Sequence, residues 1–310
     1  MKFNEFIPIW IEKKKPYVKG STLASYKLTI KKHLLREFGD LEINNIDNEI
    51  VTKYAFSLLD NGLSIKSVQD IIIILKTILK QATIDGYSQS KIIEVKYPKI
   101  YSDNFKKQEI ETFNENDYTK LINYCKEHIT NKNLGILIVA YSGMRIGEIC
   151  ALKWGDIDID NEIIKIDKTL QRIYTDDEGD EDNTKIVIQS AKTENSNRNI
   201  PIISDLMRIL RPLVKLYNPN FYILSNEEKP IEPRVYREYY RRLLNKLKIK
   251  YLKFHGLRHS FATRCISKGI DVKTVSDILG HSKVEITMNL YVHPNNDDKK
   301  KAIQKAFKGI

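Results

Sequence analysis

The chain has few cysteines and no long apolar runs, and each shortage excludes a class of protein. Its three cysteines, Cys125, Cys150 and Cys265, are scattered through apolar helical patterns. We therefore expect reduced core thiols, and neither a disulfide framework nor a zinc site. No apolar run approaches the ~20 residues that span a bilayer. The first residues lead straight into an amphipathic pattern, so we expect a cytoplasmic protein with no signal peptide and no membrane partner.

Two common solutions for phosphate chemistry are also missing from the sequence. It contains no Gly-rich phosphate-binding loop and no cluster of Asp and Glu at metal-ligand spacing. Any reaction at a phosphate would then need cationic side chains, in place of a metal, to stabilise the charge. We predict that the protein uses no cofactor and no metal.

Positive charge is what the sequence has in excess. Lys and Arg number 51 against 40 Asp and Glu, which gives a formal charge of +11 and points first to nucleic acid. Residues 229–253 hold nine basic residues and two acids, and Tyr236, Tyr239 and Tyr240 are interleaved among them. This segment is either a helix that follows DNA phosphates or a solvated face with tyrosines packed beneath it. The predicted DNA-binding residues are Arg234, Arg237, Arg241 and Arg242 here, and Lys27 and Lys31 near the N-terminus.

The length of 310 residues favours two domains. Residues 1–97 show four helical apolar patterns with short connections, which predict a compact helical domain. Residues 98–113 lose this periodicity and contain Pro98, so they predict an interdomain linker. The expected helix starts and stops are Phe3 for the first helix, Ser21 to Gly39 for the second, Asn48 to Gly62 for the third and Ser64 to Gly86 for the fourth.

Residues 114–310 predict a second domain that mixes helices with short strands. Asn114 or Asn116 can cap its first helix, and the buried helix around residues 136–140 is broken at Gly143. Isoleucine patterns near residues 157–166, 186–188 and 200–202 indicate strands, and helices resume near Ser204. An acidic loop at residues 176–182 is expected to lie away from DNA. The expected fold class is mainly α with a small antiparallel β-sheet.

Five polar side chains in the second domain suit one reaction, the attack of a tyrosine on a phosphodiester. Guanidinium groups of Arg145 and Arg258 can each grip two anionic oxygens. His255 lies three residues before Arg258, on the same helical face. Gly280 ends a helix and leaves His281 at a turn, and Tyr291 closes the helix that follows. A free phenol has a pKa of about 10, so Tyr291 would need cations or a base beside it to react.

Each of these residues also has an ordinary interpretation when it is taken alone. An isolated arginine is usually a surface or ion-pair residue, and a lone histidine in a helix is usually a core residue with its hydrogen bonds satisfied. Tyr291 is one of 17 tyrosines. The combination carries the hypothesis, and no single residue does.

The motifs that hold these residues resemble those of tyrosine recombinases of the phage-integrase family. The order, the spacing and all six active-site positions agree with the family, and the helical N-terminal domain resembles it more loosely. The matching segments are Ser142-Gly143-Met144-Arg145-Ile146-Gly147-Glu148, Ala191-Lys192-Thr193 with Arg198-Asn199-Ile200-Pro201, His255-Gly256-Leu257-Arg258-His259-Ser260-Phe261-Ala262-Thr263, and Leu279-Gly280-His281-Ser282 ending in Tyr291-Val292-His293.

The resemblance implies a role for each of these residues. Arg145 and Arg258 would clamp the scissile phosphate, while His255 and His281 would move protons and bind phosphate oxygens. Lys192, on a hairpin between two strands, would protonate the leaving 5′ oxygen, with Lys185 as the competing lysine. Tyr291 would attack and leave a 3′-phosphotyrosine and a 5′ hydroxyl. Glu148 would orient these groups without contacting the DNA itself, unless it is an ordinary solvated carboxylate.

The resemblance also implies partners and an architecture. Both domains would clamp duplex DNA, and a homotetramer would act on two DNA sites, with a monomer or dimer in the absence of DNA. A C-terminal helix at about residues 297–308 would dock on a neighbouring protomer or on its own domain. The chain is similar to the simple two-domain type, without an extra N-terminal arm-binding domain. We expect it at the nucleoid of a prokaryotic cytoplasm, with a possible accessory directionality factor.

The expected function is site-specific recombination, in the integration and excision of a mobile element or in inversion and resolution. Two alternatives remain open from the sequence. The first is DNA relaxation like that of a type IB topoisomerase, which shares the nucleophile and the arginines. The second is a sequence-specific DNA-binding protein that has lost catalysis.

Overall fold

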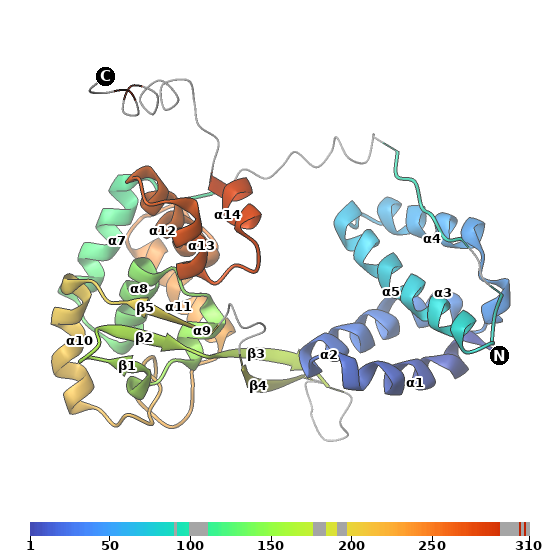
Figure 1. Cartoon of the computed structure of the whole chain (residues 1–310), viewed down its shortest axis with the longest axis horizontal. Coiled ribbons are helices and arrows are strands. Elements are labelled where there is room, and N and C mark those ends of the chain that lie inside the picture. Colours follow the sequence, from blue (N-terminus) through green and yellow to red (C-terminus); the bar gives the residue numbers. More distant parts are fainter. Residues whose placement is uncertain are drawn as a thin grey trace. The chain divides into compact units, whose positions relative to one another are not determined.

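The computed structural model describes residues 1–89, 92–98, 111–175, 184–190 and 197–291, together with Gln304 and Phe307. The chain divides into two compact units, which are treated separately below (Figure 1). Unit 1 comprises Met1–Glu109 and Ile173–Lys185, and unit 2 comprises Ile110–Arg172 and Ile186–Ile310. Most of the predicted linker, the acidic loop and most of the predicted C-terminal helix lie outside the described residues. No helix in the described ranges has the length and apolar character needed to cross a membrane.

Unit 1 is a bundle of helices around an aromatic and aliphatic core. Asp47 caps α4, and Ser64 caps α5 by accepting a hydrogen bond from the Ser67 amide, as the sequence predicted for Ser64. The core includes the fully buried side chains of Phe3, Phe6 and Trp10. The helices are α1 (Phe3–Lys14), α2 (Gly20–Thr29), the π-helix η2 (Ile30–Leu34), α3 (Leu35–Phe38), α4 (Asn48–Asp60) and α5 (Ile65–Ile84), with 3-10 turns at Lys15–Tyr17 and Ile43–Asn45.

The second predicted helix differs from the prediction in two ways. It begins at Gly20 with Lys19 as N-cap residue, so Ser21 lies inside the first turn and does not cap it. A π turn then interrupts it before it ends at Phe38. Within that turn the His33 carbonyl accepts a hydrogen bond from the Tyr54 hydroxyl at 2.5 Å, a contact from a distant helix that no local pattern encodes.

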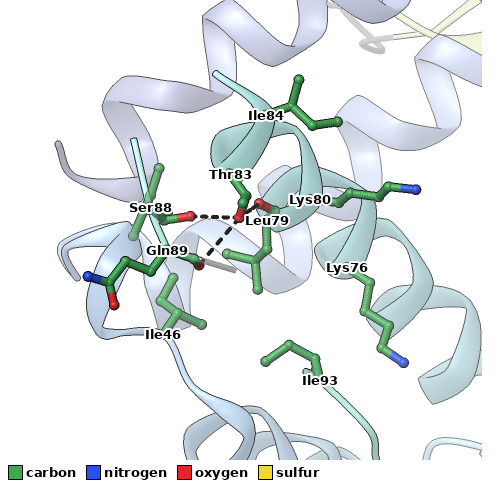
Figure 2. Close-up of a pocket in the computed structure, with 10 residues that line it drawn as sticks. Ile46, Lys76, Leu79, Lys80, Thr83, Ile84, Ser88, Gln89 and Ile93 are labelled. Atoms are coloured by element: carbon green, nitrogen blue, oxygen red, sulfur yellow. Dashed lines mark hydrogen bonds between the residues drawn. The ribbon is translucent and has the colours of Figure 1, made fainter. Parts of the chain in front are cut away.

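Unit 1 also contains a cavity of about 490 Å³ beside the C-terminal half of α5 (Figure 2). The Thr83 hydroxyl lies 3.0 Å from the Ser88 hydroxyl and 3.4 Å from the Gln89 carbonyl, and these contacts hold the segment after α5 along one wall. Lys76 and Lys80 belong to the lining, while Ile46 and Ile93 supply apolar surface. None of the predicted catalytic residues is among those that line this cavity.

Unit 2 packs helices around a small antiparallel sheet, which agrees with the predicted fold class. Strands β1, β2 and β5 form an antiparallel sheet in that order, with Ile164 opposite Ile200, and β3 and β4 form a two-stranded sheet. The strands are β1 (Ile157–Asp158), β2 (Ile163–Ile166), β3 (Lys168–Tyr174), β4 (Thr184–Ser190) and β5 (Arg198–Pro201). The helices are α7 (Glu115–Glu127), α8 (Asn131–Ser142), α9 (Ile146–Ala151), α10 (Ser204–Leu216), α11 (Pro233–Lys246), α12 (His255–Ser267), α13 (Val272–Leu279) and α14 (Val284–Tyr291), with a 3-10 turn at Trp154–Asp156.

Helix α8 lies at the centre of unit 2 and is buried on nearly every side. A Cβ atom at Gly135 would overlap Leu224 and the Tyr236 hydroxyl, so only glycine lets α11 approach this closely. Tyr236 and Tyr240 belong to α11, and their side chains are completely buried on its inner face. These two tyrosines therefore pack beneath the basic residues of the segment, as the interpretation of a solvated face with packed tyrosines predicted. Asn114 is the residue that caps α7, and the three cysteines are free thiols.

Candidate active site

The C-terminal end of α13 collects three arginines from three different elements. The Ile278 carbonyl accepts from Arg198 Nε at 2.6 Å, and the Leu279 carbonyl accepts from Arg258 Nη2 at 2.9 Å. The next carbonyl, of Gly280, accepts from Arg145 Nη2 at 3.0 Å. The last carbonyls of a helix have no partner within it and form the negative end of its dipole. The end of α13 is therefore well suited to hold cationic side chains.

Two glycines shape the turns at this place. Gly143 ends α8 with φ +66°, and Gly280 ends α13 with φ +67°, a left-handed conformation that favours glycine. A Cβ atom on Gly143 would overlap the side chains of Leu279 and Phe261, so the two turns are packed against each other. The motifs around Arg145 and His281, far apart in the sequence, meet here.

Arg258 is the most deeply buried of the cations, with only 1% of the residue exposed. Its Nη1 donates to the Gly143 carbonyl at 2.9 Å, and its Nη2 donates to the Leu279 carbonyl. The two carbonyls fix the plane of the guanidinium between the ends of α8 and α13. The sequence predicted a cation at this position, but it did not predict that the cation would be part of the core.

Glu148 links two of these arginines. Only 5% of its side chain is exposed, so it is not a solvated helix carboxylate. It accepts from Arg145 Nη1 at 2.8 Å and from the Arg145 amide at 2.8 Å, and its two oxygens accept from Arg198 Nη1 at 3.1 Å and Nη2 at 2.8 Å. Burial alone would raise the pKa of this carboxyl, but the bonds and charges of Arg198 and Arg145 outweigh it and hold the pKa at about 2.

Both predicted histidines are neutral at pH 7. His255 is the first residue of α12, and part of its surface is exposed. The groups packed around its imidazole desolvate the ring, and this effect, followed by the positive charges nearby, lowers the pKa of His255 to about 4. Desolvation and the charges of Arg258 and Arg145 lower the pKa of His281 to about 4 as well. Because the same two arginines act on both imidazoles, the four groups share one site. A neutral imidazole has one donor and one acceptor nitrogen, so each can relay a proton.

Each imidazole also has an identified neighbour. His281 Nδ1 lies 2.8 Å from the hydroxyl of Thr287, which is fully buried on α14. The His255 ring meets the His259 ring edge-on, with centroids 4.5 Å apart. Helices α12, α13 and α14, which carry or flank these residues, pack on one another (Figure 1).

An open cavity of about 730 Å³ lies over this cluster. Its lining includes Arg145, Glu148, His255, Gly280 and Ser282, together with β3 residues and the first half of α11. Such a cavity, bordered by Arg145 and by the imidazole of His255, can receive an anionic oxygen. Among the described residues, no three His, Cys, Asp or Glu side chains are grouped so that they could hold a metal ion.

The structure separates the predicted DNA-binding residues into three groups. Arg234 and Arg237 line the cavity. Arg241 and Arg242 are exposed further along α11, outside the cavity lining, and both pair with Glu238 at 2.9 Å. The remaining two, Lys27 on α2 and Lys31 on η2, belong to unit 1.

Of the predicted catalytic residues, Lys192 is not described by the structure, and Tyr291 is described only in its backbone. Lys192 falls between β4 and β5 in the sequence and lies outside the described residues. Tyr291 is the last residue of α14, and its side chain is not described. Their roles stay predictions.

The sequence did not predict the contacts that Arg198 and Thr287 make with residues of the site. Arg198 lies within a quoted motif, yet no role was assigned to it; a buried carboxylate at Glu148 would have required a partner of this kind. Thr287 lies four residues before Tyr291, on the same face of α14, and this spacing was the available signal.

Comparisons with known proteins match both units. The sequence profile described as the phage integrase family matches residues 111–298, and that of the phage integrase N-terminal SAM-like domain matches residues 2–59. A protein named tyrosine recombinase XerC-like, from Caldanaerobacter subterraneus subsp. tengcongensis, is 28% identical over 310 residues, which cover 93% of this chain and 74% of that protein.

Solved structures share the fold at low sequence identity. The Tn1549 transposon integrase in complex with a circular-intermediate DNA superimposes with a TM-score of 0.77 at 19% identity, covering 99% of each chain. A lambda integrase tetramer bound to a Holliday junction gives a TM-score of 0.62 at 16% identity, covering 96% of this chain and 80% of that one.

Proposed function

The chain belongs to the phage integrase family, and from this we propose that it is a site-specific DNA recombinase that cuts and rejoins duplex DNA through a 3′-phosphotyrosine. One observation carries the proposal. Arg145, Arg258, His255 and His281 share one site at the end of α13, and α14 runs from that site to Tyr291.

In the proposed reaction Tyr291 is the nucleophile and the 5′ oxygen of the next nucleotide is the leaving group. The bond from the phenol oxygen to phosphorus forms while the bond from phosphorus to the 5′ oxygen breaks. The phenol proton passes to the neutral imidazole of His255, and Lys192 supplies a proton to the leaving oxygen. The phosphotyrosine conserves the bond energy, and a 5′ hydroxyl of another strand then reverses the same steps to rejoin the DNA.

Arg145 and Arg258 contribute differently to the charge at the phosphate. Arg145 is about one-third exposed and lines the cavity, so its guanidinium can reach phosphate oxygens directly. Arg258 lies beneath and supplies positive charge from a site with little water, where the charge acts strongly. Glu148 remains ionised and holds Arg145 in place from behind.

DNA is the proposed partner at the cavity and beyond it. Arg234 and Arg237 extend the cation-lined surface from the site along α11, and they would contact the phosphates next to the cleaved one. By analogy with the lambda integrase tetramer on a Holliday junction, we propose four protomers on two DNA sites. The C-terminal segment at about residues 297–308 would connect protomers, an accessory factor would set direction, and the reaction would take place at the nucleoid in the cytoplasm.

Capture of covalent complexes tests the proposed function. The purified protein would be incubated with sheared genomic DNA of the source organism, denatured, and collected together with any DNA joined to it. We expect the captured ends to fall at one or a few sequences and to carry free 5′ hydroxyls. Relaxation of any supercoiled plasmid, with ends at many sequences, would indicate a topoisomerase instead. Sequence-selective binding with no covalent product would indicate a protein that has lost catalysis.

A further inference from the structure

The side chain of Arg198 is buried and forms hydrogen bonds to two different elements of unit 2. Only 6% of its side chain is exposed, and it is the first residue of β5, opposite Ile166 of β2. Its guanidinium reaches out of the sheet in two directions. Both Nη atoms donate to Glu148 on α9, and Nε donates to the Ile278 carbonyl on α13. One side chain thus ties the rigid sheet to the two elements that carry Arg145 and His281.

The charge on Glu148 depends on this contact. A buried carboxylate is costly unless it is paired and hydrogen-bonded. Arg145 alone is a weak partner because about a third of it is in water, whereas Arg198 is buried and forms the two-bond fork that suits a carboxylate. Arg198 therefore keeps Glu148 ionised, and the ionised Glu148 is what orients the Arg145 guanidinium.

We propose that Arg198 is a positioning residue for strand cleavage, which acts through Glu148 on Arg145 and through the Ile278 carbonyl on the turn that carries His281. This inference rests on the proposed function. Arg198 does not line the cavity, so it contacts neither DNA nor the reacting atoms. It sets the geometry of groups that do.

The proposal differs from a purely structural role in its dependence on pH. In Arg198→Gln, Glu148 keeps only Arg145 as a cationic partner, and Arg145 is about one-third exposed, so the pKa of Glu148 rises from about 2 toward and above the ordinary carboxyl range. As the pH falls, Glu148 then takes up a proton, and its ion pair with Arg145 is lost. Cleavage by this variant should acquire an additional acid limb, beyond any loss of rate that protonation of the histidines causes in the wild type. A loss of stability alone would lower the rate by the same factor at every pH at which the protein stays folded.

The experiment uses single-turnover cleavage of a nicked duplex that carries the captured sequence, between pH 5.5 and 8.5, with DNA affinity and thermal melting measured in parallel. We expect Arg198→Gln to cleave about 100-fold more slowly at neutral pH, since misplacement by ~1 Å costs about that much, and to bind DNA normally. Its rate should fall further below pH 7. Arg198→Lys keeps the charge but not the fork, so it should recover part of the rate and show no additional acid limb.

Two further variants make the outcome decisive. The double variant Arg198→Gln/Glu148→Gln has no carboxyl to titrate, so it should be slow with no additional acid limb. Arg264→Gln loses the two-oxygen ion pair with Glu115 on the same unit, at 2.6 and 2.8 Å, and should cleave like the wild type. If Arg198→Gln does not fold, Arg198→Lys decides, and a wild-type rate for that variant overturns the proposal.

Failure of the proposed function would give a different result. In that case the wild type itself would form no covalent product. A wild type that cleaves, with an Arg198→Gln variant of equal rate and pH profile, would overturn only the role of Arg198.

Discussion

The Nδ1 atom of His281 lies 2.8 Å from the hydroxyl of Thr287, one helical turn before Tyr291 on the same helix. Thr287 is fully buried, so this hydrogen bond fixes the orientation of the imidazole. It also fastens α14 to the turn that follows α13. One contact therefore positions both His281, the proposed proton-transfer group, and the helix that ends in Tyr291, the proposed nucleophile.

We expect Thr287→Val to slow strand cleavage by about 10-fold, without a change in DNA affinity. Valine has nearly the same shape but leaves His281 Nδ1 without a partner, and a buried hydrogen bond contributes about 0.5–1.5 kcal/mol. Single-turnover cleavage of the captured duplex measures this. Thr287→Ser keeps the hydroxyl and should be close to the wild type. Equal rates for valine and serine variants would show that the contact is irrelevant to the reaction.

His255 and His281 should remain neutral in the free protein until the pH approaches about 4. The folded pKa lies below the unfolded value of about 6.5, so the unfolded chain takes up protons first as the pH falls. Stability contributed by these histidines is therefore lost between about pH 6.5 and 4, and little more is lost below that range.

Histidine NMR tests this titration directly. Ring carbon and proton shifts would be followed from pH 8 to 4, and His255→Gln and His281→Gln would assign the two signals. Bound DNA should raise both pKa values, because a phosphate favours the charged imidazole. Midpoints between pH 6 and 7 for both signals without DNA would contradict the described environment.

Arg258→Ala should lower cleavage by ~10²–10³ or more, the range lost with one key oxyanion donor. It should also destabilise unit 2, because the carbonyls of Gly143 and Leu279 lose their donor and each such loss costs about 1–3 kcal/mol. Cleavage rates and urea unfolding would be measured on the same preparation. A variant that stays near the wild type in both assays would refute the assignment.

Arg237 and Arg241 form a matched pair on one exposed face of α11. Arg237 lines the cavity, whereas Arg241 lies outside it and is paired with Glu238. We expect Arg237→Ala to weaken DNA binding and to reduce the salt dependence of affinity by about one phosphate contact, with a smaller effect for Arg241→Ala. Binding titrations over a range of salt concentrations give both quantities. The reverse order would place the DNA path elsewhere on α11.

The sequence predicted those parts of the fold that depend on neighbours in the chain. Ser64 and Asn114 cap the expected helices, and Gly280 ends α13 in the left-handed conformation. A cap or a stop needs only residues within a few positions of itself, so a single sequence is sufficient.

The contacts that build the site could not be predicted in this way. Arg198 meets Glu148 across 50 positions and the Ile278 carbonyl across 80. Arg258 meets the Gly143 carbonyl across 115 positions, and its burial follows from that packing. The motifs identified which residue types would gather, but the partners of each became visible only in the folded chain.

The most direct test of the central claim is peptide mass spectrometry of the covalent complex, trapped on a nicked duplex with the captured sequence. We expect a single modified peptide, with the nucleotide joined through phosphate to Tyr291, and none in Tyr291→Phe, although this variant still binds the DNA. A phosphate link to another residue, or an unchanged yield of covalent complex from Tyr291→Phe, would contradict the claim.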